Sequence, residues 1–239
     1  MGKTPSSAVR NLKAILSKLK ASAEPAVLRV AGKNTLEIKD VLVGEVWVCS
    51  GQSNMEWPLN RSENPDKAIN AAANPNIRLF TVPKLRAPAP VDDVKSQWVP
   101  CTPDNVRNFT AVGYFFGRDL QAALGVPVGL VHTSWGGSPA EVWMSDSTLK
   151  SNPNYQRDIV DTYYPALDRW VKGGRQGFSP WRPTELYNGM IYPLLNYGIA
   201  GAIWYQGESN AGRAWQYRQL FADMITNWRR DFRQGNFPF

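Results

Sequence analysis

Hydrophobic residues recur along this chain at two spacings, one typical of buried strands and one typical of amphipathic helices. Short apolar runs rich in β-branched and aromatic residues predict strands, and apolar positions three or four residues apart predict helices. Strands that alternate with helices predict an α/β domain with a mostly parallel sheet covered by helices on both faces. The predicted strands span residues 45–50, 77–82, 127–134 and 199–206, and residues 236–239 resemble the start of a fifth.

Three helices are predicted between these strands. A shorter one lies near residues 65–73, and a second spans residues 112–125, where Gly125 provides a common C-terminal stop. The clearest helix spans residues 215–232, and one of its faces carries Tyr217, Leu220, Phe221, Met224, Ile225 and Trp228.

The pattern before residue 44 is different. Residues 26–43 alternate apolar and polar positions around the turn sequence Ala-Gly-Lys-Asn, which predicts a β-hairpin. Residues 6–21 have helical spacing with basic residues between the apolar ones. That segment is open to three interpretations: a basic amphipathic helix, a leader, or the broken edge of a preceding domain. We therefore divide the chain into a head at 1–43 and an α/β domain at 44–239.

Residues 141–190 are rich in aromatic side chains and poor in regular pattern. Long irregular segments of compact domains are often functional. Aromatic residues make up 12% of the chain, and their flat faces suit either a sugar site or a large core. We predict that this segment is a loop that shapes a sugar pocket.

The charge of the chain argues against a nucleic-acid partner. The net charge is +7, but +5 of it lies in the first twenty residues, so the rest of the chain is nearly neutral. Binding to phosphate backbones needs a basic stripe, which the body lacks. No apolar run reaches the length of a membrane span, and no secretory leader is visible. Cys49 and Cys101 are too few for a disulfide framework, and the sequence leaves their pairing open.

Polar and glycine-rich clusters follow three of the predicted strands. In doubly wound sheets the ligand crevice lies outside the carboxyl ends of the strands, so these clusters are expected to meet there. Each cluster also has an ordinary interpretation. Ser53 after Gly51 could be a nucleophile or a helix N-cap. The pair Gly136 and Gly137 after His132 could be a tight turn. Ser209 and Asn210 after Gln206 could cap the next helix.

Four long blocks make a resemblance specific. They read VLVGEVWVCSGQSNMEWPL (41–59), GVPVGLVHTSWGGSPAEVW (125–143), LYNGMIYPL (186–194) and GAIWYQGESNA (201–211). In this order they resemble the signature blocks of the sialate O-acetylesterases, which belong to the SGNH, or GDSL-like, serine hydrolases. The resemblance implies a flavodoxin-like three-layer fold. It also implies removal of O-acetyl groups from a glycan through an acyl-serine intermediate, without a cofactor or a metal.

The resemblance also assigns roles to residues of this chain. Ser53 matches the nucleophile, and the oxyanion donors would be the N–H groups of Ser53 and Gly137 and the side chain of Gln206. Where other superfamily members read Gly-x-Asn-Asp, this chain has Gly207-Glu208-Ser209-Asn210. Asn210 is therefore an alternative donor. The remaining residues expected to contact substrate are Gln52, Asn54, His132, Glu208 and Asn210.

A serine hydroxyl needs a base, which relatives supply in an Asp-x-x-His motif near the C-terminus. The only histidine of this chain is His132, in the second block, where we expect it to be structural or to line the substrate. Glu208 is a weaker alternative base. The resemblance thus implies a chain truncated at both ends, with the hairpin as a remnant of a β-sandwich and the Asp-x-x-His supplied by a further segment or a second chain.

The resemblance leaves the substrate and the compartment less defined. O-acetylated sialic acid is the expected sugar, with acetyl-xylan or another acetylated polysaccharide as the alternative. Without its histidine, the chain could also be a non-catalytic carbohydrate-binding fragment. Relatives are often exported, so the resemblance leans towards a location outside the cytoplasm.

Overall fold

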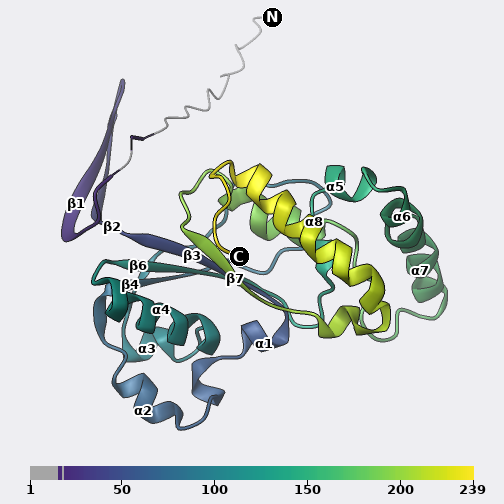
Figure 1. Ribbon diagram of the computed structural model, residues 1–239, viewed down its shortest axis with the longest axis horizontal. Coiled ribbons are helices and arrows are strands. Elements are labelled where there is room, and N and C mark those ends of the chain that lie inside the picture. Colours follow the sequence, from purple (N-terminus) through teal and green to yellow (C-terminus); the bar gives the residue numbers. More distant parts are fainter. Residues whose placement is uncertain (1–15, 18) are drawn as a thin grey trace, which may run out of the picture.

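The computed structural model describes residues 16–17 and 19–239, and within them one five-stranded sheet organises the α/β domain (Figure 1). The strand order is β5-β4-β6-β3-β7. Strands β4, β6, β3 and β7 run parallel, and β5 is an antiparallel edge. The mostly parallel sheet expected from the alternating pattern is confirmed. Its strands are β3 (Glu45–Gly51), β4 (Asn74–Thr81), β5 (Val99–Cys101), β6 (Val128–Ser134) and β7 (Gly201–Tyr205).

Helices cover both faces of this sheet, in three layers. In Figure 1, α2, α3 and α4 lie on one side and the long α8 on the other. The helices of the described residues are α1 (Ser53–Glu56), α2 (Pro65–Asn70), α3 (Pro103–Val106), α4 (Ala111–Leu124), α5 (Asp146–Lys150), α6 (Pro153–Tyr155), α7 (Asp161–Lys172) and α8 (Ala214–Phe232). Short 3-10 or π-helical turns occupy Leu59–Arg61, Ala140–Trp143, Gln156–Val160, Tyr187–Ile191, Tyr192–Leu194 and Glu208–Arg213.

Two hydrophobic clusters correspond to these layers. One packs around Leu130, Tyr114 and Met55 on the α4 side. The other packs around Trp143, Met224 and Trp228 on the α8 side. The apolar face predicted for residues 215–232 supplies much of the second cluster. Gly125 ends α4 in the left-handed conformation, with φ 67°, as predicted.

The predicted fifth strand at 236–239 is wrong. These residues are not a strand, although the Ala202 N–H donates a hydrogen bond of 3.0 Å to the Pro238 carbonyl beside β7. Pro238 has no N–H, so it cannot continue a ladder. The edge strand β5, which contains Pro100, was not predicted; proline is tolerated at sheet edges because one side of an edge strand needs no partner.

The expectation of an irregular loop at 141–190 is also wrong. This segment contains α5, α6 and α7 as well as two π-helical turns. Helix α7 has no buried residue and carries Pro165 inside it. The apolar residues Tyr163, Leu167 and Trp170 of α7 nevertheless recur at helical spacing, so the pattern that predicts this helix was present in the sequence and was overlooked.

The hairpin predicted at 26–43 is confirmed as β1 (Ser22–Ala31) paired with β2 (Thr35–Val43). Figure 1 shows it extending away from the α/β domain. The boundary between 43 and 44 stays a prediction. The helix considered at 6–21 lies mostly outside the described residues, and residues 19–21 have no regular structure.

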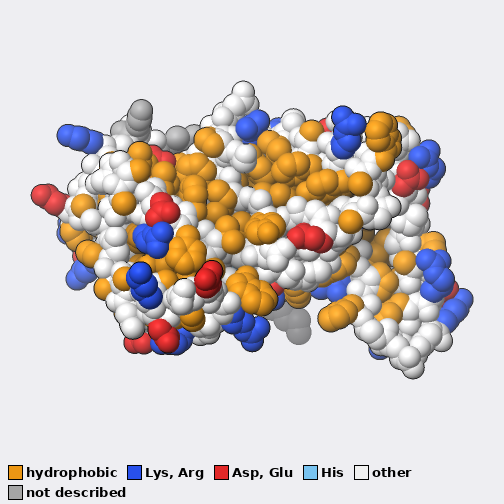
Figure 2. Space-filling model, turned by 60° about the horizontal axis from the view of Figure 1, so that its bottom comes forward, with side chains coloured by type: hydrophobic (Ala, Val, Ile, Leu, Met, Phe, Trp, Pro, Cys, Tyr) orange, Lys and Arg blue, Asp and Glu red, His pale blue; other side chains and the backbone are white. Residues whose placement is uncertain are grey.

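Three further observations concern sequence expectations. Cys49 and Cys101 are buried and not bonded to each other. Among the helices of the described residues, none is long and apolar enough to cross a membrane. On the face shown in Figure 2, Lys and Arg side chains are interspersed with Asp and Glu.

Candidate functional site

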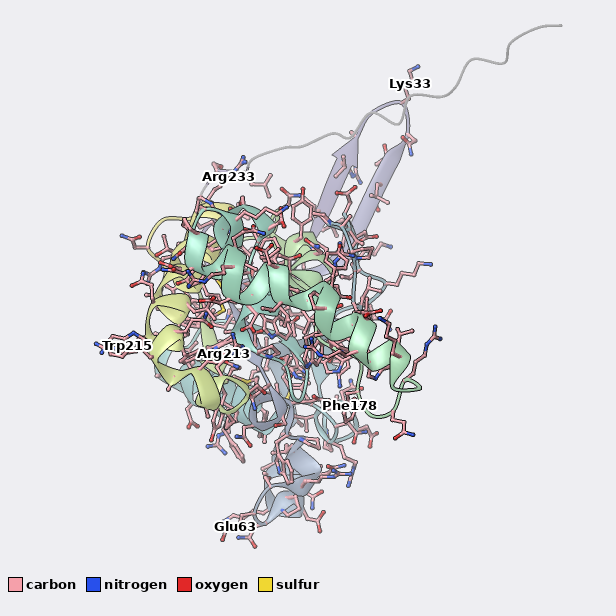
Figure 3. All side chains as sticks on the ribbon, turned by 90° about the vertical axis from the view of Figure 1, so that its right-hand side faces the viewer. Lys33, Glu63, Phe178, Arg213, Trp215 and Arg233 are labelled. Carbon is pink, nitrogen blue, oxygen red and sulfur yellow. The ribbon has the colours of Figure 1, made fainter. Side chains whose placement is uncertain are left out.

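The carboxyl ends of β3, β6 and β7 meet at one edge of the sheet. Gly51 at the end of β3 is in register with Ser134 on β6 and with Tyr205 on β7. The three polar and glycine-rich clusters singled out in the sequence follow these strand ends, so the structure brings them together. Figure 3 looks onto this edge from the right-hand side of Figure 1.

Ser53 is the first residue of α1 and is exposed. The N-cap position of α1 belongs to Gln52, in an extended conformation, so the alternative that Ser53 is an N-cap is wrong. Within the described part of the chain, the Ser53 hydroxyl has no hydrogen-bond partner. An exposed and unpaired hydroxyl at a strand end can reach an incoming ester.

The backbone before Ser53 is held on both sides. The Gln52 N–H donates to the Tyr205 carbonyl at 2.9 Å, and the Trp135 N–H donates to the Gly51 carbonyl at 3.1 Å. Gly51 has φ 142°, and a Cβ there would lie 2.1 Å from the Tyr205 carbonyl oxygen. Only glycine allows β3 and β7 to approach so closely at the turn into α1.

The loop after β6 lies against Ser53. A Cβ at Gly136 would lie 3.4 Å from the Ser53 Cβ, and the Gly136 N–H donates to the Glu56 carboxylate at 2.7 Å. Gly137 has φ 76° and open space around it. Among the described residues nothing accepts the Gly137 N–H. That donor is therefore free for a ligand, whereas the Gly136 donor is already used.

Glu56 holds this loop, and the sequence interpretation missed it. Its carboxylate accepts from Gly136 and pairs with Lys84 at 2.5 Å, and the Lys84 ammonium lies 5.4 Å from the centre of the Trp135 ring. The one available signal was its place three residues after Ser53, which puts both on neighbouring positions of a helix.

Gln52, Asn54 and Glu208 join the turn before α1 to the loop after β7. The Gln52 Oε1 accepts from the Ser209 N–H at 3.2 Å and the Gly207 N–H at 3.4 Å. Asn54 Nδ2 donates to the Glu208 carboxylate. The structure thus brings together three of the five residues expected to contact the substrate, and their hydrogen bonds link one loop to the other.

Gln206 and Asn210 are both engaged with protein atoms. Gln206 Nε2 donates to the Ser138 carbonyl at 3.2 Å and to Asn210 Oδ1 at 2.7 Å, and its Oε1 is buried without a partner among the described residues. Asn210 also accepts from the Ala140 N–H at 2.9 Å. Which amide serves as oxyanion donor stays a prediction, and Gln206 must release one bond to do so.

Asn210 does not cap α8, because it lies one turn earlier in the 3-10 turn Glu208–Arg213. It is buried, and its Nδ2 donates to Glu141 at 2.9 Å. Glu141 in turn pairs with Arg213. Sequence reasoning missed this pair because 72 positions separate its members and neither lies in a recognisable charge pattern.

His132 lies on β6 and is buried. Its Nε2 lies 2.6 Å from the Ser134 hydroxyl, and the Phe109 ring packs 5.5 Å from the imidazole. Burial lowers the pKa of His132 to about 4, against an opposing effect of the Glu56 carboxylate. The imidazole is therefore neutral at neutral pH, and its observed partner is Ser134 rather than Ser53.

No group of three or more His, Cys, Asp or Glu side chains that could hold a metal occurs in the part of the chain that the structure describes.

Comparisons with known proteins point in one direction. Residues 43–239 match the family model described as "Carbohydrate esterase, sialic acid-specific acetylesterase". The chain is 37% identical over 236 residues to the mouse sialate O-acetylesterase, covering 86% of this chain and 44% of that protein. The human sialate O-acetylesterase is 34% identical over 222 residues, with 86% and 40% coverage. The chain thus spans less than half the length of these relatives.

A solved structure agrees with the family match. The crystal structure of a carbohydrate acetylesterase from Xanthomonas citri is 40% identical and superposes with a TM-score of 0.72. The similarity covers 88% of this chain and 43% of that one.

Proposed function

Because the chain belongs to the carbohydrate esterase family of sialic acid-specific acetylesterases, we propose that it carries the nucleophile and oxyanion groups of a serine esterase that removes O-acetyl groups from carbohydrates. The observation that supports this most is Ser53. Its hydroxyl is exposed and has no partner in the described part of the chain, at the edge where three parallel strands end. This is where open α/β sheets bind their ligands.

In the proposed reaction the Ser53 Oγ attacks the acetyl carbonyl carbon. The oxyanion that forms accepts hydrogen bonds from the N–H groups of Ser53 and Gly137, and from Gln206 once its side chain releases Ser138 or Asn210. A base takes the Ser53 hydroxyl proton and passes it to the sugar oxygen as the bond between that oxygen and the acetyl carbon breaks. The products of this step are the free sugar hydroxyl and an acetyl-serine ester. Water then hydrolyses this ester, which releases acetate and restores the Ser53 hydroxyl.

We propose that the base is a histidine outside these 239 residues, supplied by a further segment or a second chain. The single histidine of the sequence, His132, is buried and paired with Ser134. The Glu208 carboxylate accepts a hydrogen bond from Asn54, and Glu208 would have to give up that hydrogen bond to act as the base. Because no base contacts Ser53 in the described part of the chain, the second candidate function is carbohydrate binding without catalysis.

The proposed sugar is O-acetylated sialic acid. The family description and the mouse and human relatives name sialate or sialic acid, whereas the bacterial structure is named only as a carbohydrate acetylesterase. An acetylated neutral polysaccharide such as acetyl-xylan is the alternative. We propose an acetylated glycan as partner in either case.

The test compares the chain alone with the chain joined to an Asp-x-x-His segment from a full-length relative. With para-nitrophenyl acetate, the 239-residue chain should be nearly inactive and the joined protein active. Ser53→Ala in the joined protein should lower turnover by roughly 10³-fold or more, because the acyl-serine cannot form. Near-normal turnover in that variant would contradict the proposal. Rapid turnover by the chain alone that vanishes in His132→Ala would identify His132 as the base.

A further inference from the structure

A cavity of about 290 Å³ lies beside α7, away from the Ser53 hydroxyl. Figure 3 shows α7 crossing the carboxyl edge of the sheet, with Arg213 beside it at the start of α8. The volume is at the small end of ligand sites and fits one monosaccharide rather than a longer glycan. Its lining includes Glu141, Asp158, Tyr163, Ala166, Trp181 and Arg213.

Aromatic contacts connect this cavity to the candidate site. The Trp181 ring packs against the Trp135 ring, with 5.6 Å between the ring centres. Trp135 immediately precedes Gly136, whose backbone lies against Ser53. The Arg86 guanidinium lies 4.9 Å from the Trp181 ring centre and helps to hold it. A sugar ring in the cavity would therefore lie next to the layer of side chains that borders the nucleophile.

The Arg213 guanidinium is positioned but only partly used. It donates to the Glu141 carboxylate, and to Gln216 Oε1 at 2.7 Å. A guanidinium has five N–H groups, so three remain without an acceptor among the described residues. Its side chain is 39% exposed, whereas that of Glu141 is 9% exposed. Glu141 therefore fixes Arg213 from the protein side, and its free donors are accessible from the cavity.

The other charges around the cavity are already paired. Asp158 binds the Arg157 guanidinium at 2.6 and 2.8 Å, and Glu141 divides its two oxygens between Asn210 and Arg213. Asp158 is thus paired with a cation outside the cavity lining, whereas the cation that Glu141 faces is Arg213 itself. The unmet hydrogen-bonding capacity is that of Arg213, and a planar carboxylate is the acceptor that matches a guanidinium best.

We propose that this cavity is a sugar subsite in which Arg213 binds the carboxylate of an acidic monosaccharide, with Tyr163 and Trp181 providing the aromatic walls. The proposal rests on the proposed function, for which it supplies a residue that would distinguish sialic acid from a neutral sugar. Glu141 is the positioning residue, because it acts on the ligand only through Arg213.

The experiment measures binding and needs no turnover. N-acetylneuraminic acid and its uncharged methyl ester are titrated into the 239-residue chain by calorimetry or ligand-observed NMR. The acid should bind at least about tenfold more tightly than the ester, because only the acid can pair with Arg213. Arg213→Lys keeps a cation for Glu141 but loses the planar fork, and it should remove most of this preference.

Two variants on α7 test the location. Ala166→Phe fills the cavity and should weaken both ligands by about tenfold or more. Val171→Phe on the same helix is the matched control, since Val171 is exposed and does not line the cavity, and it should leave both affinities unchanged.

Equal affinities for acid and ester, a preference that survives Arg213→Lys, or no binding of either ligand would each overturn the proposal. Binding that Ala166→Phe leaves intact would place the sugar elsewhere and overturn it as well. The Ser53→Ala assay on an aryl acetate does not depend on this cavity. If the binding preference is absent but Ser53→Ala abolishes turnover, the subsite proposal fails and the esterase proposal stands. If the preference is present but Ser53→Ala keeps turnover, the esterase proposal fails instead.

Discussion

The turn from β3 into α1 and the helix α7 lie at the same edge of the sheet, but they are built differently. At the turn, backbone hydrogen bonds to both neighbouring strands hold Gly51 and Gln52, and a glycine is required at the point of closest approach. Helix α7 has no buried residue, and its Tyr164 is 63% exposed. One region is fixed by the sheet, and the other rests on the surface.

This difference matches the roles that we propose for the two regions. A nucleophile and its oxyanion donors work only when their positions are held to a fraction of an ångström, which close backbone contacts provide. A subsite wall contributes shape and can tolerate change. The ion pair between Asp168 and Lys172 on α7 is exposed, and pairs of this kind add little stability.

The largest expected effect concerns the glycines of the two regions. Gly51→Ala should lower the free energy of unfolding by at least about 4 kcal/mol, because the new Cβ meets the Tyr205 carbonyl and φ 142° is closed to alanine. Gly174, just after α7, has φ 78° and open space, so Gly174→Ala should cost only about 1–2 kcal/mol. Denaturant unfolding of both variants measures these losses. Equal losses of unfolding free energy would show that the two regions do not differ in how tightly they are held.

The pH dependence of stability tests the burial of His132, which lies on β6 next to the turn from β3 into α1. His132 has a pKa of about 4 in the fold and an ordinary value of 6.5 when unfolded. Between these values the unfolded chain binds the proton and the folded chain does not, so stability falls as the pH drops from about 6.5 towards 4. The loss from this group is at most about 3 kcal/mol. In His132→Gln the slope across this window should be shallower than in wild type; parallel curves would contradict the assignment.

The contact between Glu56 and the Gly136 loop should have a smaller effect. Glu56→Ala removes the acceptor of the Gly136 N–H and should cost about 1–2 kcal/mol. It should also speed hydrogen exchange at that amide. Glu56→Gln keeps an oxygen in place and is the control. If exchange at Gly136 is unchanged in Glu56→Ala, then the loop is held by other contacts.

The smallest effect is expected on α7. Tyr164→Ser changes a side chain that is mostly exposed, and the free energy of unfolding should change by no more than about 0.5 kcal/mol. Thermal or denaturant unfolding checks this. A loss above 2 kcal/mol would show that α7 packs as tightly as the strand end, which would remove the contrast between the regions.

The sequence by itself determined the parallel part of the sheet and the edge at which the candidate site lies. Strands β3, β4, β6 and β7 follow from short apolar runs, because helices cover both faces of the sheet. Helices α4 and α8 follow from periodicity, because each buries one face and repeats apolar residues at helical spacing. Ser53, Gly137 and Gln206 were predicted as site residues because motifs at the ends of parallel strands converge on one edge. The family resemblance then assigned their roles, and the family comparison confirmed the resemblance.

Only the tertiary structure decided which hydrogen-bond and ion-pair partners the side chains at that edge have. The partners Glu141 and Arg213, or Glu56 and Gly136, are separated by tens of residues, and no local pattern encodes which donor meets which acceptor. The same holds for residues 236–239, which lie beside β7 but where Pro238 ends the hydrogen-bond ladder. Periodicity reports what a segment buries, and pairing between distant segments depends on where the whole chain places them.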